Sequence, residues 1–182
     1  QRMLTETLDL LIITDPSNMN YTTGYDGWSF YVPQGVIISL DHDEPIWFGR
    51  RQDSKGAKVT TYLRHDNILG YPEDLIQSPP QHPYDYLSDF LASKNWSNKN
   101  IGVEMDSYYY TAECHERLIR GCPNASFYNA YLLINWIRLI KSEKEISYMK
   151  DASVLTQIGM QTAYDSIKPG VRQNQVAGNI QN

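Results

Sequence analysis

The 182-residue chain has the composition of a globular protein, with 41% hydrophobic residues and a formal net charge of −5. This length suffices for one domain, or for one domain and part of another, around a buried core. The charge is spread without a basic stretch, which argues against a nucleic-acid partner. No run of eighteen apolar residues and no signal-peptide pattern is present, so we expect a cytoplasmic protein without a membrane partner.

The first structural signal is a strand followed by a short capped helix. The apolar run at residues 8–14, LDLLIIT, lacks helical periodicity and predicts a strand buried on both faces. Asp15 can cap a helix, Pro16 suits the first helical position, and Gly24 can adopt the left-handed conformation that ends a helix. We therefore expect a helix over residues 16–23.

A hairpin and a helix are expected next. Residues 30–40 and 44–49 are rich in β-forming side chains and are joined by the polar segment DHDE, which predicts two antiparallel strands. Pro33 and Gly35 make the first strand irregular at its start. The polar segment at residues 50–63 has helical character.

The alternation continues through the rest of the first 139 residues. The remaining signals are a strand at 67–71, a proline-rich loop at 72–83, a helix at 84–94, a strand at 100–105, a helix at 111–122 and a strand at 125–130. Six strands alternating with helices predict an α/β fold with a mixed sheet, in which the hairpin supplies the antiparallel strand.

Two cysteines, Cys114 and Cys122, are predicted to be reduced thiols that serve packing. Eight residues of helix separate them by about 12 Å along the axis, which is too far for a disulfide bond.

The sequence changes character near Leu139. Ser142 and Glu145 form a capping-box pattern, and apolar residues then recur at helical spacing as far as Ile167. A helix from Ser142 to Ile167 would be about 39 Å long, longer than a small domain needs. We therefore expect a first domain at residues 1–139, and at residues 140–182 a linker helix with the start of a second domain.

Three segments are candidates for binding a ligand. The segment DPSNMNYTTGYDGWSFYVP follows the first strand and combines polar groups with the aromatic residues Tyr21, Tyr25, Trp28, Phe30 and Tyr31. Ligands tend to bind at this end of the strands in open α/β sheets. In GRRQD, Arg50 or Arg51 can clamp a carboxylate while Asp53 holds the guanidinium. In EMDSYYYT, the tyrosines at 108–110 are expected to pack one domain against another. Each segment also has a purely structural interpretation, as core packing or ion pairing.

Two motifs, one near each end of the first domain, carry a resemblance to a known family. The first consists of Asn18, Tyr21 and Gly24. The second consists of Arg138, Lys141, Ser142, Glu145, Ile146, Met149 and Ala152. With these spacings the chain resembles the N-terminal domain of the creatinase/prolidase (pita-bread) family. The resemblance implies a three-layer α/β/α domain with a six-stranded mixed sheet and a ribonuclease H-like motif, followed by the first helices of a truncated pita-bread domain.

The resemblance also implies where the chemistry takes place. Family members carry their catalytic groups in the pita-bread domain, either as a dinuclear metal site of two Asp, one His and two Glu or as a metal-free site centred on a His. These groups would lie beyond Asn182. We therefore expect no catalytic residue, metal ligand or cofactor within this chain, which would be inactive alone, whereas the full-length protein would be a C–N hydrolase with or without a metal.

Homodimers are implied as well, because family N-terminal domains line the rim of the partner's active site. The residues predicted to contact substrate are Tyr25, Trp28, Tyr31, Arg51 and Asp53. The alternative is a pure dimerisation scaffold, in which the aromatic segment is buried against a neighbour.

The segments EPIWFGRRQD and IGVEMDSYYYTA are similar to the ectoine-hydrolysing branch of the family. Ectoine is a small zwitterion, an amidinium carboxylate, so an aromatic face and an arginine are suitable partners. An Xaa-Pro dipeptide needs similar groups, which makes a proline dipeptidase the alternative.

Overall fold

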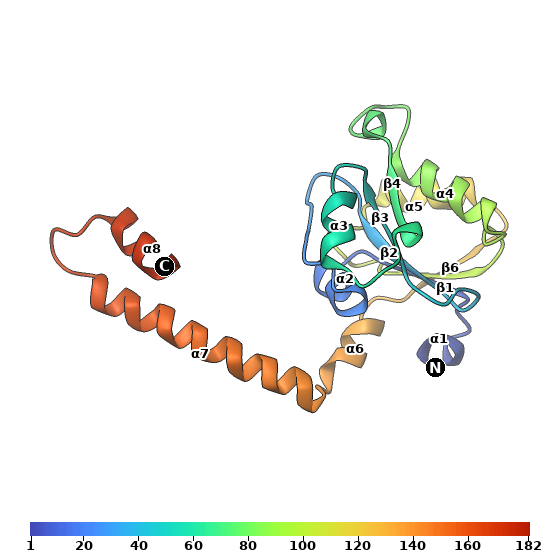
Figure 1. The fold of residues 1–182 in the computed structure, drawn as a ribbon. Coiled ribbons are helices and arrows are strands. Elements are labelled where there is room, and N and C mark those ends of the chain that lie inside the picture. The colour runs from blue at the N-terminus through green and yellow to red at the C-terminus, as the bar shows by residue number, and fades with distance from the viewer. The chain divides into compact units, whose positions relative to one another are not determined.

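The computed structural model describes residues 1–182, which divide into two compact units (Figure 1). The first unit comprises residues 1–137 and the second comprises residues 138–182.

The first unit is built on one six-stranded mixed sheet. Its strands are β1 (Leu10–Ile13), β2 (Gly35–Ser39), β3 (Ile46–Arg50), β4 (Ile68–Tyr71), β5 (Asn100–Val103) and β6 (Ser126–Asn129). The order across the sheet is β4-β3-β2-β1-β5-β6, and β2 alone runs antiparallel to its two neighbours. The predicted mixed sheet, with its antiparallel strand supplied by the hairpin, is thereby confirmed.

Six helices belong wholly or mainly to this unit. They are α1 (Arg2–Thr5), α2 (Pro16–Thr23), α3 (Ser54–Thr60), α4 (Pro83–Ser93), α5 (Ala112–Gly121) and α6 (Leu133–Leu139). Short 3-10 turns, η1 (His65–Asn67) and η2 (Glu73–Leu75), flank β4. The helices α1 and α6 were not predicted, and α1 has no side-chain cap that the sequence would reveal.

The second predicted strand differs most from its expected length. Residues 30–34 are not paired, and β2 begins only at Gly35, opposite β3. Pro33 has no backbone N–H to donate to a neighbouring strand. The preceding residues therefore form a loop instead of extending the sheet. Phe30 and Tyr31 of this loop are exposed, whereas Val32 and Gln34 are buried.

Helices cover both faces of the sheet and bury a core on each, as Figure 1 shows. On one face α4 and α5 contribute Tyr84, Leu87, Leu91, Cys114 and Leu118, among others, to the cluster around Leu10, Ile12 and Phe48. On the other face Met19 of α2, Ala57 of α3 and Leu133 of α6 pack with Leu11, Ile13 and Trp47. This arrangement confirms the three-layer α/β/α fold. Cys114 and Cys122 are buried free thiols, as expected, and burial raises the pKa of both.

Local capping signals fix the start and the end of α2, as the sequence predicts. The carboxylate of Asp15 accepts hydrogen bonds from the backbone N–H groups of Ser17 (2.9 Å) and Asn18 (3.2 Å). Gly24 ends the helix in the left-handed conformation, with φ of 79°. A side chain at this position would be strained, since residues other than glycine rarely adopt that conformation.

Glu104 directly follows β5 and is 1% exposed. One carboxylate oxygen accepts the backbone N–H groups of Thr14 and Asp15, both at 2.7 Å. The other carboxylate oxygen accepts a hydrogen bond from Nδ2 of Asn18 at 2.6 Å. The same amide nitrogen also donates to Oδ1 of Asn135 at 2.8 Å. Burial raises the pKa of Glu104, although these donors act in the opposite direction. One carboxylate thus joins the ends of β1 and β5 to the starts of α2 and α6.

Helix α4 begins with an unusual capping box. His82 Nδ1 accepts the backbone N–H of Tyr84 (3.1 Å), and the carboxylate of Asp85 accepts the backbone N–H of His82 (3.0 Å). Burial and the neighbouring Arg117 lower the pKa of His82. The neutral imidazole is the form that can accept this capping bond, because protonation removes the lone pair on Nδ1.

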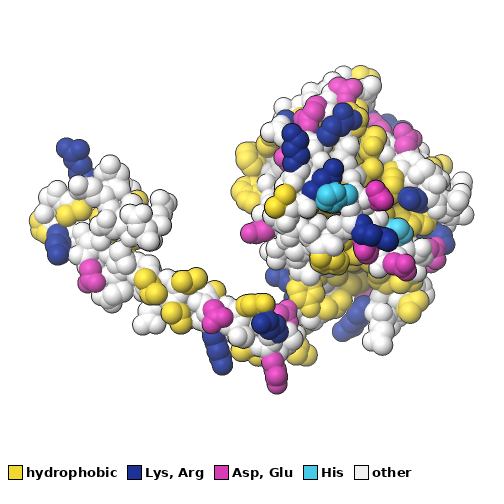
Figure 2. Space-filling model, viewed as in Figure 1, with side chains coloured by type: hydrophobic (Ala, Val, Ile, Leu, Met, Phe, Trp, Pro, Cys, Tyr) yellow, Lys and Arg dark blue, Asp and Glu magenta, His cyan; other side chains and the backbone are white.

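The second unit contains α7 (Glu143–Ser166) and α8 (Gln173–Gln181). The predicted capping box is present, since Ser142 Oγ accepts the N–H of Glu145 and Glu145 accepts the N–H of Ser142. Apolar residues of α7, including Ile146, Met149 and Leu155, are exposed, as the hydrophobic side chains along this helix in Figure 2 show. None of the helices combines the length and the apolar character needed to cross a membrane.

Replacing Glu104 by Gln is expected to lower the free energy of unfolding by about 2 to 3 kcal/mol. An amide has only one acceptor oxygen, so its NH2 group would face a donor that now binds the carboxylate. Urea denaturation of E104Q and wild type tests this expectation, with E116Q on the exposed surface of α5 as the control. Equal stability of E104Q and wild type would contradict this account of the network.

The lowered pKa of His82 predicts a pH-dependent stability. The unfolded chain takes up this proton near pH 6.5 and the folded chain only at lower pH, so stability is lost as pH falls below about 6.5. The variant H82S keeps a capping oxygen but has no titrating ring. Its free energy of unfolding should therefore fall less between pH 7.5 and pH 5.5 than that of the wild type. Denaturation curves at both pH values measure the difference, and the exposed-site variant H65S should behave as wild type.

Candidate functional site

Several connecting segments meet at one edge of the sheet, which we name the carboxyl edge. The strands β1, β3, β4, β5 and β6 run in the same direction, so their C-terminal ends and the start of β2 lie along this edge. All three segments that the sequence indicated follow such ends. Figure 2 shows charged side chains of both signs interspersed over the face in view, with no large basic patch there.

The aromatic loop, residues 25–33, joins α2 to β2 and exposes three large side chains. Trp28, Phe30 and Tyr31 are 61%, 78% and 49% exposed. The ring of Phe30 lies 5.7 Å from that of Trp28 and 5.5 Å from that of Tyr31, measured between centroids. Apolar side chains grouped in this way on a surface commonly mark a binding site.

Tyr25, which was predicted to face the substrate, is instead a core residue. It is 6% exposed, and its ring lies 5.2 Å from that of Trp47. Its hydroxyl donates to Gln34 Oε1 at 3.4 Å, and burial raises its pKa to about 12. Tyr25 therefore anchors the aromatic loop to the core and does not contribute to its exposed surface.

The guanidinium that contacts the aromatic loop belongs to Arg50. Its Nε binds the Glu73 carboxylate at 2.6 Å, and its Nη1 donates to the Tyr31 hydroxyl at 2.8 Å. Glu73 also accepts the backbone N–H of Gln52 at 2.9 Å. Together these bonds tie the exposed tip of the loop to the turn that follows β4.

Arg51 and Asp53 do not form the predicted clamp. The Arg51 side chain is exposed, and its backbone N–H donates to the Tyr71 carbonyl. Asp53 is half-buried: burial raises the pKa of its carboxyl, whereas the nearby Arg50 lowers it. The carboxylate that holds a guanidinium here is thus Glu73, which the sequence interpretation did not select.

A cavity of about 490 Å³ lies beside the aromatic loop. Three segments line it: residues 29–33 of the loop, residues 75–83 between η2 and α4, and residues 108–117 at the start of α5. Its size is within the range of small-molecule sites. Tyr31 is the one predicted substrate-binding residue that lines this cavity.

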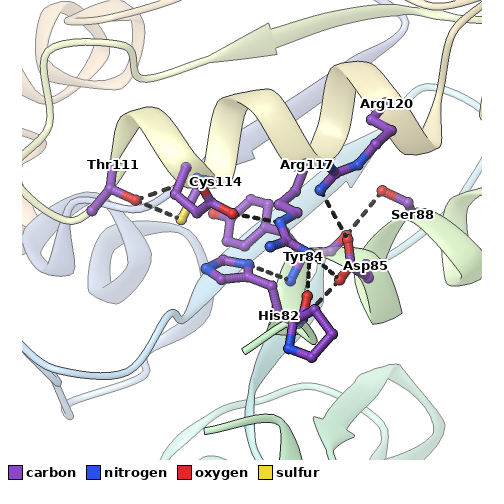
Figure 3. Close-up of polar contacts among 10 residues, drawn as sticks. His82, Tyr84, Asp85, Ser88, Thr111, Cys114, Arg117 and Arg120 are labelled. Carbon is purple, nitrogen blue, oxygen red and sulfur yellow. Dashed lines mark hydrogen bonds and ion pairs between the residues drawn. The ribbon is translucent and has the colours of Figure 1, made fainter. Parts of the chain in front are cut away.

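Glu113 and Arg117 line one wall of the cavity. They belong to a larger set of charged side chains on α4 and α5 (Figure 3). Arg117 reaches from α5 and binds Glu113 at 2.5 Å, Asp85 at 2.8 Å and the Pro80 carbonyl at 2.8 Å. Arg120 lies 4.0 Å from Asp85. The two arginines balance the two carboxylates, so this set of four side chains carries no net charge.

Sequence reasoning missed this wall. From the sequence, the segment 72–83 is interpreted only as a loop. Two signals were available: His82 precedes Pro83 at a helix start, and Glu113 and Arg117 are four residues apart on one helix.

The three tyrosines after β5 have different environments. Tyr108 is fully exposed, Tyr109 is half-buried in the cavity wall, and Tyr110 is buried with its hydroxyl 2.8 Å from His115 Nδ1. The suggestion that they pack one domain against another stays a prediction. No group of three or more His, Cys, Asp or Glu side chains in the chain is arranged to hold a metal ion.

Comparison with known proteins finds close relatives among hydrolases. The chain is 45% identical over 180 residues to an uncharacterised hydrolase/peptidase, y4tM, of Sinorhizobium fredii, covering 99% of this chain and 46% of that protein. It is 42% identical over 179 residues to ectoine hydrolase of Halomonas elongata, covering 98% of this chain and 45% of that protein. It is 24% identical over 174 residues to an Xaa-Pro dipeptidase of Lactobacillus helveticus, covering 94% of this chain and 44% of that protein. The chain thus spans about half the length of these relatives.

Solved structures and a family model agree with this assignment. An X-Pro aminopeptidase of Thermotoga maritima superposes with a TM-score of 0.74 at 16% identity, over 98% of this chain and 45% of that one, which shows a shared fold. The family model for the creatinase/prolidase N-terminal domain matches residues 1–140. The chain therefore belongs to the creatinase/prolidase family, and residues 1–140 form its N-terminal domain.

Proposed function

We propose that this chain is the N-terminal part of an enzyme that opens the cyclic amidine ring of ectoine by hydrolysis. The observation that carries the proposal is the 42% identity to ectoine hydrolase, sustained over 98% of the chain. Identity to the Xaa-Pro dipeptidase over a similar length is 24%. Because this chain spans 45% of the length of ectoine hydrolase, we place the catalytic groups in the remainder of the protein.

The exposed part of the aromatic loop suits the substrate chemically. Ectoine carries a delocalised positive charge on its ring, and aromatic faces such as those of Trp28 and Phe30 attract cations. Its carboxylate needs hydrogen-bond donors. Tyr31 can supply one, because Arg50 donates to the Tyr31 oxygen and leaves the hydroxyl proton free to bind an acceptor.

We further propose that the full-length protein is a homodimer in which the aromatic loop lines the active site of the partner subunit. Support comes from the exposure of three neighbouring aromatic residues on a loop whose ends are fixed by Tyr25 and by Arg50. A rigid aromatic surface of this kind costs little entropy to place against a ligand.

The activity of the full-length protein is the first test. Ring opening of ectoine followed by NMR should yield the acyclic amino acid, whereas an Xaa-Pro dipeptide should remain intact under the same conditions. A parallel sample with a chelator establishes whether a divalent metal assists. Cleavage of the dipeptide without ring opening of ectoine would contradict the proposal and favour the dipeptidase.

Replacing Trp28 by Ala in the full-length protein tests the placement of the aromatic loop. Loss of one aromatic face for a cation should raise the KM for ectoine roughly tenfold and leave the dimer intact. Y128A, which removes an exposed aromatic side chain from the edge strand β6, serves as the control. Dissociation of the W28A dimer with unchanged turnover per folded subunit would instead indicate a dimerisation scaffold.

A further inference from the structure

The cavity beside the aromatic loop combines an apolar wall with hydrogen-bond donors. The rings of Phe30, Tyr31 and Tyr109 line it, together with Pro33 and Pro83. Small-molecule sites have this composition, mainly aromatic and apolar with a few placed polar groups. The flat faces of these rings suit a compact ring more than an extended chain.

Two hydrogen-bond donors that line the cavity, on His82 and Tyr31, have fixed protonation. Nδ1 of His82 accepts the capping bond from Tyr84, so the proton of the neutral imidazole is on Nε2. The Tyr31 oxygen accepts from Arg50, so its hydroxyl proton is available to a ligand. Neither group has to rearrange in order to donate a hydrogen bond.

The electrostatic environment favours an anionic group between these donors. The first turns of α4 and α5 adjoin the cavity, since Pro83 and Thr111 line it, and helix N-termini carry partial positive charge. Glu113, which also lines the cavity, is neutralised by Arg117 at 2.5 Å. This carboxylate is thus paired and does not repel an incoming anion as a free charge would.

We infer that this cavity binds a small cyclic carboxylate, with its ring against the tyrosines and its carboxylate between His82 and Tyr31. The choice of ectoine as the compound of this class rests on the proposed function. The inference goes further, because it assigns to the 182-residue chain an ability to bind the ligand without the catalytic part of the protein. Such a site would collect the ligand at the same edge of the sheet that carries the aromatic loop.

Calorimetric titration of the 182-residue chain tests this inference. Ectoine and L-proline, both cyclic carboxylates, should bind saturably. L-Prolinamide, in which the carboxylate is replaced by an amide, should bind at least tenfold more weakly than L-proline. The open-chain product of ectoine hydrolysis should also bind more weakly than ectoine, because it has no ring to pack on the tyrosines.

Variants locate the site. H82S keeps the helix cap but removes the Nε2 donor, and should weaken ectoine binding about tenfold, whereas H65S should not change it. Y31F keeps the half-exposed ring and removes only the hydroxyl, so it should weaken binding severalfold and provides a second test if H82S unfolds. Absence of saturable binding, equal binding of prolinamide and proline, or binding unchanged in both variants would overturn the inference.

This result is independent of the turnover test. Ring opening by the full-length protein without binding to the 182-residue chain would refute the cavity site and leave the proposed function standing. Binding at the cavity without ring opening would refute the proposed function alone.

Discussion

The arrangement of the carboxyl edge depends on one buried carboxylate. Glu104 accepts hydrogen bonds from two successive backbone N–H groups at the end of β1 and from the side chain of Asn18, and Asn18 in turn contacts Asn135. A charged group with 1% exposure is tolerated only because donors surround it. The same bonds fix the direction in which α2 leaves the sheet, and therefore the position from which the aromatic loop starts.

From that starting point the aromatic loop is held at both ends and exposed at its tip. Tyr25 packs on Trp47 at one end, and the bond from Arg50 to Tyr31 fixes the other. The cavity lies beside this tip and shares Tyr31 with it. Tyr31 thus belongs to both proposals, as part of the surface that faces the substrate and as a donor inside the cavity. A loop fixed in this way can present aromatic rings without ordering them on binding.

The sequence predicts those features whose signals are local. The cap at Asp15 and the capping box at Ser142 depend on residues within one helical turn, and both are present. The contacts of Glu104 join residues 86 to 90 positions apart, and Arg50 meets Glu73 across 23 positions, so no local pattern could reveal them. Tyr25 and Trp28 look equivalent in the sequence. Packing against Trp47 decides that the first is buried, whereas Trp28 stays exposed.

In our proposal the aromatic loop faces the substrate of a creatinase/prolidase-family enzyme. A crystal structure of the full-length protein with bound ectoine provides the test. We expect the ring of Trp28 or of Phe30 to lie within about 4 Å of the ligand. A structure in which ectoine occupies the active site while these rings are buried against another protein surface, away from the ligand, would contradict it.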